Sequence, residues 1–555
     1  MLSAAGIFMR TVSVAFNVYV SGKVGAEGMG LLTLVSSVYG FAITFATSGI
    51  NIAVVRLVSS ALPPDSQICE FDKKSNASVG RIMRGAICYC LLFGFLSSFI
   101  LFISANNIGI RLLNDIRTVP SLKFLSFSLI PIAVSSAING YFCAVRRVYK
   151  NVCVQFCEQC VKIFTVTALL LTIAPSGLEY ACIAVVGGGS LSEGASVIIN
   201  GILYLFDRKI HKKSNENYDD KKCFLSKFGA YIPEGAQKNV GFSKKESQGE
   251  KGGRKSASFG KGFSEIFSIA FPVAVGAYVR SALVTIEHLA IPWGLKRSGF
   301  NASRALASYG VLHGMVFPLL LFPSAVLGAF ASLLVPELSS SQSHGETKRI
   351  KYIVSRVFSL TLLFSIGVSG IFICYSYEIG TYLYSSTEAA EFIKMLSPLI
   401  PLMYLDGAVD TMLKGLGHQL YTMRVNIADS LISILLLLIF LPNYGIQGYI
   451  AVIFITELFN TSFSIIKLLN VTGVQTPVIK WVAKPLITVV AATAVSRILF
   501  DFNVISKVLG TVITGKPLAF TEIGVTAVLY ILLSALFGAI SKDDIRWAKS
   551  VVHNP

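Results

Sequence analysis

Three arginines stand inside long apolar segments of the sequence, where a charged side chain is costly. Arg10 and Arg56 lie in the first two of these segments, and Arg280 lies in the seventh. A guanidinium near the centre of a bilayer costs between about 2.5 and 17 kcal/mol, so it persists where it faces water, a counter-charge or a ligand. Because a planar guanidinium binds phosphate oxygens through two parallel hydrogen bonds, we expect these arginines to bind an anion in a wet cavity. The alternative is that each side chain extends to the membrane surface.

Five carboxylates well inside the later apolar segments are candidates for a further site, namely Glu287, Asp406, Asp410, Asp429 and Glu457. Asp406 and Asp410 are four residues apart and share a helical face, with Lys414 one turn further on. Two carboxylates that close together are suited to hold a proton or a sodium ion, so the sequence predicts an ion-coupling site here. A hydrated pair neutralised by Lys414 is the alternative. Glu287 follows Arg280 by seven residues, and either pairs with it or joins the ion site.

Glu158 and Lys162 are spaced four residues apart in the order that favours pairing, so we expect a structural pair on one helical face. Ten cysteines lie mostly in apolar segments, and Cys153, Cys157 and Cys160 share one face. We interpret these three as small packing residues rather than as metal ligands. We find no Walker loop, dinucleotide-binding glycines or HExxH motif. The sequence therefore predicts no catalytic residue, metal or cofactor, and His313 is expected to be a hydrogen-bonded histidine within the membrane.

The elements that position these residues are membrane helices. Hydrophobic residues make up 53% of the 555 residues, charged residues 14%, and the mean hydropathy is +0.66, which is too apolar for a soluble protein of this length. Fourteen apolar segments of 18 or more residues predict an all-α integral membrane protein. They lie near 1–20, 31–60, 85–104, 122–145, 152–173, 180–206, 264–293, 305–335, 352–375, 392–413, 419–441, 446–466, 481–500 and 518–540.

Charge gives the orientation. If the N-terminus is cytoplasmic, the inward loops and the C-terminus hold 33 of the 48 Lys and Arg residues, and the outward loops hold 10. This asymmetry predicts a multi-pass protein with both termini in the cytoplasm. It also accounts for the net charge of +18 without a nucleic-acid partner.

The sequence further predicts two related halves joined by a linker. Residues 207–262 hold 14 basic and 7 acidic residues, a composition that predicts an unfolded cytoplasmic linker, lying near anionic lipids or serving only as a tether. Shifting the chain by 280 residues aligns 29–40 with 309–320, and shifting it by 271 aligns 144–159 with 415–430. These alignments favour two six-helix lobes related by a parallel repeat, with a substrate path between them. The expected domains are residues 1–206, 207–262, 263–471 and 472–555, the last holding two additional helices and a cytoplasmic tail.

Three stretches of the sequence resemble one family. FMRTVSVAFNVYVSGKVGAEGMGLLTLVSSVYGFAITFATSGINIAVVRLVSS is similar to the start of the stage V sporulation protein B family. YGVLHGMVFPLLLFPSAVLGAFASLLVPELSSSQ is similar to the segment that opens the second lobe's gate, and LKGLGHQ is similar to a short cytoplasmic turn after helix ten. One departure is Asn17, where the family usually carries another basic residue on the first helix.

The resemblance implies a branch of the polysaccharide-exporter and lipid II flippase superfamily, with fourteen helices. It implies that the protein moves a polyprenyl-pyrophosphate-linked saccharide across the plasma membrane by alternating access, driven by H⁺, Na⁺ or the membrane potential. The expected substrate is a precursor of peptidoglycan or of another cell-envelope polymer, with sporulation as one context. The expected partners are this lipid-linked saccharide, membrane lipids and cell-wall synthesis proteins, and Arg10, Arg56 and Arg280 would bind the pyrophosphate.

Two alternatives remain at this point. A multidrug or cation antiporter of the same superfamily would keep the fold, but arginines in the cavity argue against a cationic cargo. A membrane glycosyltransferase or polymerase would need a large outward loop with catalytic carboxylates. The longest outward loops, near 105–121 and 501–517, hold only Asp115 and Asp501 as acids, so no enzyme is predicted.

Overall fold

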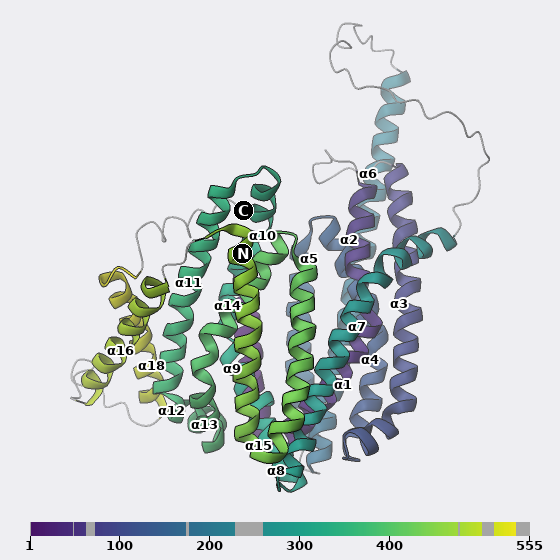
Figure 1. Cartoon of the computed structure of the whole chain (residues 1–555). Helices are drawn as coiled ribbons and strands as arrows, with labels where there is room; N and C mark the ends of the chain where they lie inside the picture. Colours follow the sequence, from purple (N-terminus) through teal and green to yellow (C-terminus); the bar gives the residue numbers. More distant parts are fainter. Residues whose placement is uncertain are drawn as a thin grey trace.

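The computed structural model describes residues 2–47, 49–62, 73–173, 177–227, 259–474, 478–501 and 516–539. In this part of the chain all the regular elements are helices, and thirteen of them are long and apolar enough to cross a membrane (Figure 1). Two of the thirteen fold back on themselves and two others follow each other end to end, so the chain makes about fourteen passes. The predicted all-α membrane fold is confirmed.

The first helix, α1 (Leu2–Thr47), consists of two antiparallel arms that meet at Gly25. Gly25 has φ 75° and ψ 175°, a conformation that side chains disfavour and glycine adopts freely. Residues 21–30 separate the first two predicted apolar segments, and within that stretch Gly25 alone leaves helical geometry. A second left-handed glycine, Gly49 with φ 78°, separates α1 from α2 (Ile50–Ala61), so the predicted segment 31–60 is two helices.

The rest of the first half forms four long helices with a short π-helical end on the first of them. These are α3 (Lys73–Asn107) with η1 (Ile108–Leu112), α4 (Thr118–Ala144), α5 (Val148–Ile173) and α6 (Leu178–Lys227). The prediction that the chain is unstructured from 207 onward is wrong for 207–227, because α6 continues through this stretch, which contains neither glycine nor proline. The predicted linker at 228–258 lies outside the described residues.

Asp207 shows why α6 does not end where the apolar segment ends. Its side chain is fully buried, accepts a hydrogen bond from the Tyr141 hydroxyl at 2.9 Å, and forms ion pairs with Arg147 and Lys150. Tyr141 belongs to α4, Arg147 lies in the turn between α4 and α5, and Lys150 lies in the first turn of α5. This network joins three helices at the start of the stretch that was predicted to be linker.

The second half begins with α7 (Phe259–Arg297) and contains several helices broken at prolines. The predicted helix at 305–335 is divided into α8 (Ala302–Tyr309), the π-helical η3 (Gly310–Val316), α9 (Phe317–Leu321) and α10 (Ser324–Ser343). Pro323 stands at the break before α10, since its ring disrupts the preceding turn and it has no N–H to donate. The predicted helix at 392–413 is likewise divided between α13 (Thr387–Leu396), η4 (Ser397–Leu399) and α14 (Ile400–Gly415).

The remaining helices are α11 (Thr347–Cys374), α12 (Ser376–Tyr384), α15 (Gln419–Thr472), α16 (Val478–Asp501) and α18 (Lys516–Leu536). Helix α15 also consists of two arms, which meet at Gly445 with φ 57° and ψ −136°. Helices α16 and α18 pack on the outer side of α11, where the Tyr530 hydroxyl donates to the Leu363 carbonyl at 2.6 Å. They correspond to the predicted additional pair.

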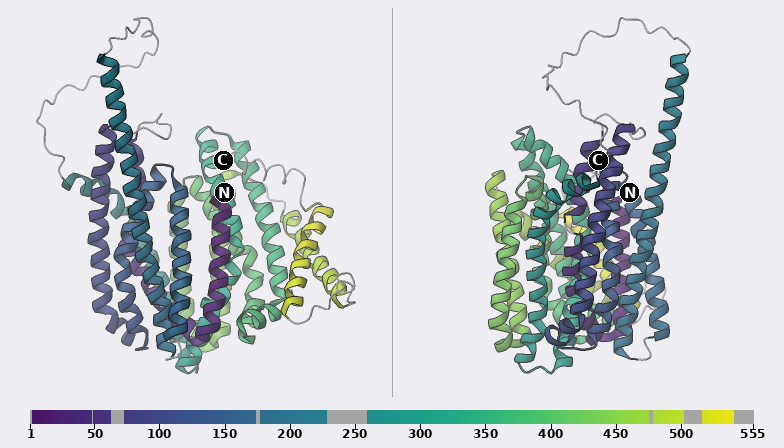
Figure 2. Two further views of the ribbon diagram at one scale, coloured as in Figure 1. Left: turned by 180° about the vertical axis from the view of Figure 1, so that it is seen from behind. Right: turned by 90° about the vertical axis from the view of Figure 1, so that its right-hand side faces the viewer.

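The helices form two groups, which we call the N-terminal group (α1–α6) and the C-terminal group (α8–α15), with α7 between them (Figures 1 and 2). Gly25, α8 and Gly445 lie at one end of the molecule, which we call the α8 side. The N-terminus and the end of α6 lie toward the other end, the linker side.

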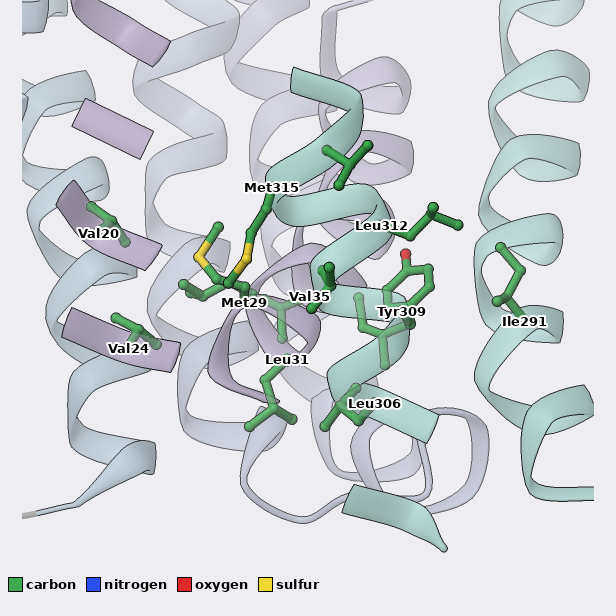
Figure 3. Close-up of a cluster of buried hydrophobic side chains, with 14 of the residues drawn as sticks. Val20, Val24, Met29, Leu31, Val35, Ile291, Leu306, Tyr309, Leu312 and Met315 are labelled. Atoms are coloured by element: carbon green, nitrogen blue, oxygen red, sulfur yellow. The ribbon is translucent and has the colours of Figure 1, made fainter. Parts of the chain in front are cut away.

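The buried cores differ between the two sides. On the α8 side one apolar core includes residues of both groups, among them Met29 and Val35 of α1 and Leu306 and Met315 of α8 and η3 (Figure 3). On the linker side there are two separate cores, one in each group. The two groups therefore share a buried core on the α8 side, and the molecule is closed there.

Two glycines allow this closure. A Cβ atom at position 310 would lie 2.1 Å from the Ala26 carbonyl oxygen, and one at position 30 would lie 2.1 Å from the Leu306 carbonyl oxygen. Neither separation is sterically possible, so the backbones of α1 and η3 approach this closely only because both positions are glycine.

Helix α7 is attached to both groups. Its first turns supply Ile266 and Ala270 to the core of the N-terminal group, and further along the Ser281 hydroxyl donates to Thr44 Oγ1 at 3.2 Å. On its other face, Glu287 accepts a hydrogen bond from the Ser433 hydroxyl of α15 at 2.6 Å.

Candidate functional site

The three predicted anion-binding arginines lie on membrane-spanning helices, and their side chains are exposed. No salt bridge joins Arg10, Arg56 or Arg280 to another residue in the described part of the chain. Arg10 lies on the first arm of α1, which runs between the two groups of helices in Figure 2. Arg280 lies on α7, within electrostatic range of Asp406 and Asp429. The first two arginines thus belong to the N-terminal group, and the third faces the acidic residues of the C-terminal group.

A polar cavity of about 440 Å³ lies inside the N-terminal group, between α1, α2, α4, α5 and α6. Its walls carry amides and carboxylates, chiefly Asn51, Asn139, Gln155, Gln159, Glu158 and Glu193. The helices that carry the two arginines of this group also line the cavity. Met9, one residue before Arg10, lines it from α1, and Asn51, five residues before Arg56, lines it from α2.

Glu158 and Lys162 do not form the predicted salt bridge in the structure, although both lie on α5. A third charge that sequence reasoning missed, Glu193 of α6, is within electrostatic range of both. Lys162 therefore lies near two carboxylates instead of one. The signal for Glu193 was present, because it is a single carboxylate inside the apolar segment 180–206, the criterion that identified the carboxylates of the second half.

The five predicted ion-coupling carboxylates come from three helices, α14 and α15 of the C-terminal group and the adjoining α7. Asp406 is within electrostatic range of Asp410 and Arg280, Asp429 is within range of Glu287 and Asp406, and Glu457 is within range of Asp406 and Asp429.

Amide side chains accompany two of these acids. Asn460 donates to Asp406 at 3.3 Å, and Asn426 donates to Asp410 at 3.4 Å. One oxygen of Asp406, one of Asp410 and one of Asp429 are buried without a hydrogen-bond partner. The sequence predicted this acidic cluster but not the two asparagines, whose positions depend on the fold.

His313 is hydrogen-bonded within the membrane, as predicted. Its Nε2 atom and the Tyr449 hydroxyl are 2.6 Å apart, and the neighbouring His288 Nδ1 atom and the Tyr309 hydroxyl are 2.9 Å apart. The two histidine rings are 4.8 Å apart between centroids and lie beside the π-helical turn η3.

The α8 side carries a polar contact between the two groups of helices. Glu27 accepts a hydrogen bond from the Ser303 hydroxyl of α8 at 2.5 Å, and forms an ion pair with Arg117 at 2.8 Å. Arg117 also binds Asp115, and these hydrogen bonds raise the pKa of the Arg117 guanidinium above its usual range, so it stays charged. The contact adds a directional link to the apolar closure.

Family models match both halves of the chain. Residues 1–230 match a polysaccharide biosynthesis protein model, and residues 297–439 match the MatE model. Stage V sporulation protein B of Bacillus subtilis (strain 168) is 26% identical over 450 residues, which covers 80% of this chain and 78% of that protein.

Solved structures share the fold. The lipid II flippase MurJ, in an inward closed conformation, superimposes with a TM-score of 0.64 and 14% identity, covering 97% of this chain and 98% of MurJ. An inward-facing multidrug resistance MATE family transporter of the MOP superfamily gives a TM-score of 0.59 and 10% identity, covering 84% of this chain and 94% of the transporter.

The fold is that of the lipid II flippase MurJ and of the MATE family transporters. In sequence, the chain is similar to stage V sporulation protein B and to the polysaccharide biosynthesis protein model. The resemblance noted in the sequence is confirmed.

Proposed function

We propose that the protein moves a polyprenyl-pyrophosphate-linked saccharide, a precursor of peptidoglycan or of another cell-envelope polymer, across the plasma membrane. The observation that carries this proposal is the set of three exposed arginines without salt bridges on membrane-spanning helices. Such charges are costly unless a ligand or water faces them, and pyrophosphate is a ligand that guanidinium groups bind strongly. The similarity to a protein titled lipid II flippase supports a lipid-linked cargo.

The proposed mechanism is alternating access. The shared core on the α8 side and the separate cores on the linker side fit a state that is closed on the α8 side. Outward release would require the α1–η3 contact to separate while the two linker-side cores approach each other, which is a rigid-body movement of two packed groups.

We place the linker side in the cytoplasm, because the short loops at that end carry most of the loop lysines and arginines. Both termini would then be cytoplasmic. The test is to introduce a cysteine into 228–258 and to treat intact cells with a membrane-impermeant maleimide. Labelling of this cysteine would contradict the proposed orientation.

The test of the proposed function is transport in proteoliposomes that contain the purified protein and a fluorescent polyprenyl-pyrophosphate saccharide. Fluorescence that an external quencher can reach should increase with time in these vesicles and not in protein-free vesicles. Equal rates in both would contradict the proposal. Parallel vesicles that contain a cationic dye test the multidrug alternative.

We further propose that the acidic cluster of the C-terminal group couples transport to an ion. Asp410→Asn should abolish the dependence of transport on pH, sodium or membrane potential, since the variant loses the charge that a proton or Na⁺ would neutralise. Transport is measured in proteoliposomes under imposed gradients, and Asp406→Asn is tested in the same way. Glu391→Gln, an exposed residue of α13, is the matched control. Unchanged coupling in both aspartate variants would favour the hydrated pair with Lys414.

A further inference from the structure

The cavity inside the N-terminal group has the features of a binding site. Its volume of about 440 Å³ falls in the range of small-molecule sites, and hydroxyl, amide and carboxylate groups line it from five helices. Among the described residues that line it, none is lysine or arginine.

Buried polar atoms in the cavity wall lack partners. Ser135 of α4 is only 6% exposed, and its hydroxyl has no hydrogen-bond partner; Asn139, one turn further along α4, has an unpartnered Oδ1 atom. Buried polar groups are normally hydrogen-bonded, and one that is left without a partner lowers the stability of the folded protein. These two groups therefore have hydrogen-bonding capacity that no described protein group uses.

The arrangement fits a hydroxylated molecule better than a metal ion. The described residues contain no cluster of three or more His, Cys, Asp or Glu side chains that could hold a metal. The polar groups instead surround a volume much larger than an ion. Amides that both donate and accept, and carboxylates that accept from neighbouring hydroxyls, match the donors and acceptors of a sugar ring.

The position of the cavity links it to the proposed cargo. Met9 of α1 and Asn51 of α2 line it, so a sugar bound there would lie against the two helices that carry Arg10 and Arg56, the residues proposed to bind the pyrophosphate. From this placement we infer that the cavity binds the sugar attached directly to the pyrophosphate. We also infer that it selects a neutral sugar, because its wall carries Glu158 and Glu193 and, among the described residues that line it, no lysine or arginine that could pair with a carboxylate on the ring. The inference rests on the proposed function.

The test is a binding measurement with three lipids on the full-length protein in nanodiscs. The lipids are undecaprenyl pyrophosphate without sugar, the same lipid carrying N-acetylglucosamine, and the same lipid carrying glucuronic acid. The wild-type protein should bind the neutral sugar lipid about tenfold more tightly than the bare lipid, as expected for a few new hydrogen bonds, and should not gain affinity for the glucuronate lipid.

Glu193→Gln should lose most of the preference for N-acetylglucosamine, and should bind the bare lipid within about twofold of the wild type, because the arginines remain. Glu179→Gln, at the start of the same helix and outside the cavity, is the matched control. Ser135→Ala removes an unpartnered hydroxyl, so it should fold normally and weaken only the sugar lipid. If Glu193→Gln is unstable, Ser135→Ala still tests the sugar site.

The outcomes separate the two proposals. If the wild type binds none of the three lipids, the proposed function fails. If it binds all three equally, or if the cavity variants weaken all three equally, the sugar site is wrong and the pyrophosphate site stands. Tight binding of the glucuronate lipid would overturn the charge selection.

Discussion

Arg10→Ala is expected to abolish transport of the lipid-linked saccharide while the protein still folds and inserts. Two charge-assisted hydrogen bonds to pyrophosphate contribute about 3 kcal/mol or more, so affinity should fall at least about a hundredfold. Folding should not suffer, because the Arg10 side chain is exposed and has no salt bridge in the described part of the chain. The measurement is quencher-accessible fluorescent lipid in proteoliposomes with matched amounts of protein.

The variant Arg10→Lys distinguishes two roles of Arg10, namely binding of the pyrophosphate and extension of its side chain to the membrane surface. Lysine keeps the charge and loses the two-pronged geometry, so it should retain only partial transport. If Arg10 merely reaches the interface, lysine should be tolerated almost fully and glutamine tolerably. Arg111→Ala, which removes an exposed arginine from η1, is the control and should transport normally. If Arg10→Ala transports the lipid at the wild-type rate, the proposal that Arg10 binds the pyrophosphate is wrong.

Gly310→Ala should open the α8 side. The added Cβ atom would lie 2.1 Å from the Ala26 carbonyl oxygen, so α1 and η3 must move apart. Overpacking of this kind costs about 1–3 kcal/mol, which shifts a conformational equilibrium by about 5- to 150-fold. Transport should fall sharply, because the closed state that the cycle requires is depopulated.

The measurement for Gly310→Ala is labelling of a cysteine placed at Met315, a buried residue of the shared core, by a water-soluble maleimide. Native cysteines are replaced in the background. Labelling should be faster than with Gly310 present. Gly22→Ala is the matched control on α1, because a Cβ atom there meets nothing within 4 Å. Unchanged labelling and normal transport by Gly310→Ala would show that the contact does not control this side.

The membrane helices could be predicted because apolar length is a local property of the sequence. Helix breaks were less predictable. The stretch 21–30 contains four glycines, all compatible with a turn, but Gly25 alone has non-helical dihedral angles. Which glycine reverses the chain depends on the packing of both arms. The helical continuation of α6 past Asp207 also depends on tertiary contacts, since Tyr141, Arg147 and Lys150 hold that carboxylate.

The parts of the candidate site that consist of a charged residue in an apolar segment could be predicted from the sequence. A single arginine or carboxylate in an apolar segment is visible without a structure, and all five predicted carboxylates of the second half lie near one another. The polar cavity was not visible, because its wall combines neutral side chains from five helices. Serine and asparagine are common between packed membrane helices, so Ser135 and Asn139 carried no signal until the structure placed them beside Glu158 and Glu193.

Helix α7 connects the two groups of helices and is attached to both of them. It packs into the N-terminal core at Ile266 and binds α15 through Glu287, whereas none of residues 5–19 on the first arm of α1 is buried. If the two groups rotate about α7, the displacement of each helix grows with its distance from α7. The edge of the molecule that moves most is then the first arm of α1. A long lipid tail that cannot enter a polar cavity would have its passage into the bilayer at that edge, beside Arg10. Spin-label distances across the α1 edge should then change more during transport than distances across α7, and equal changes would argue against a hinge.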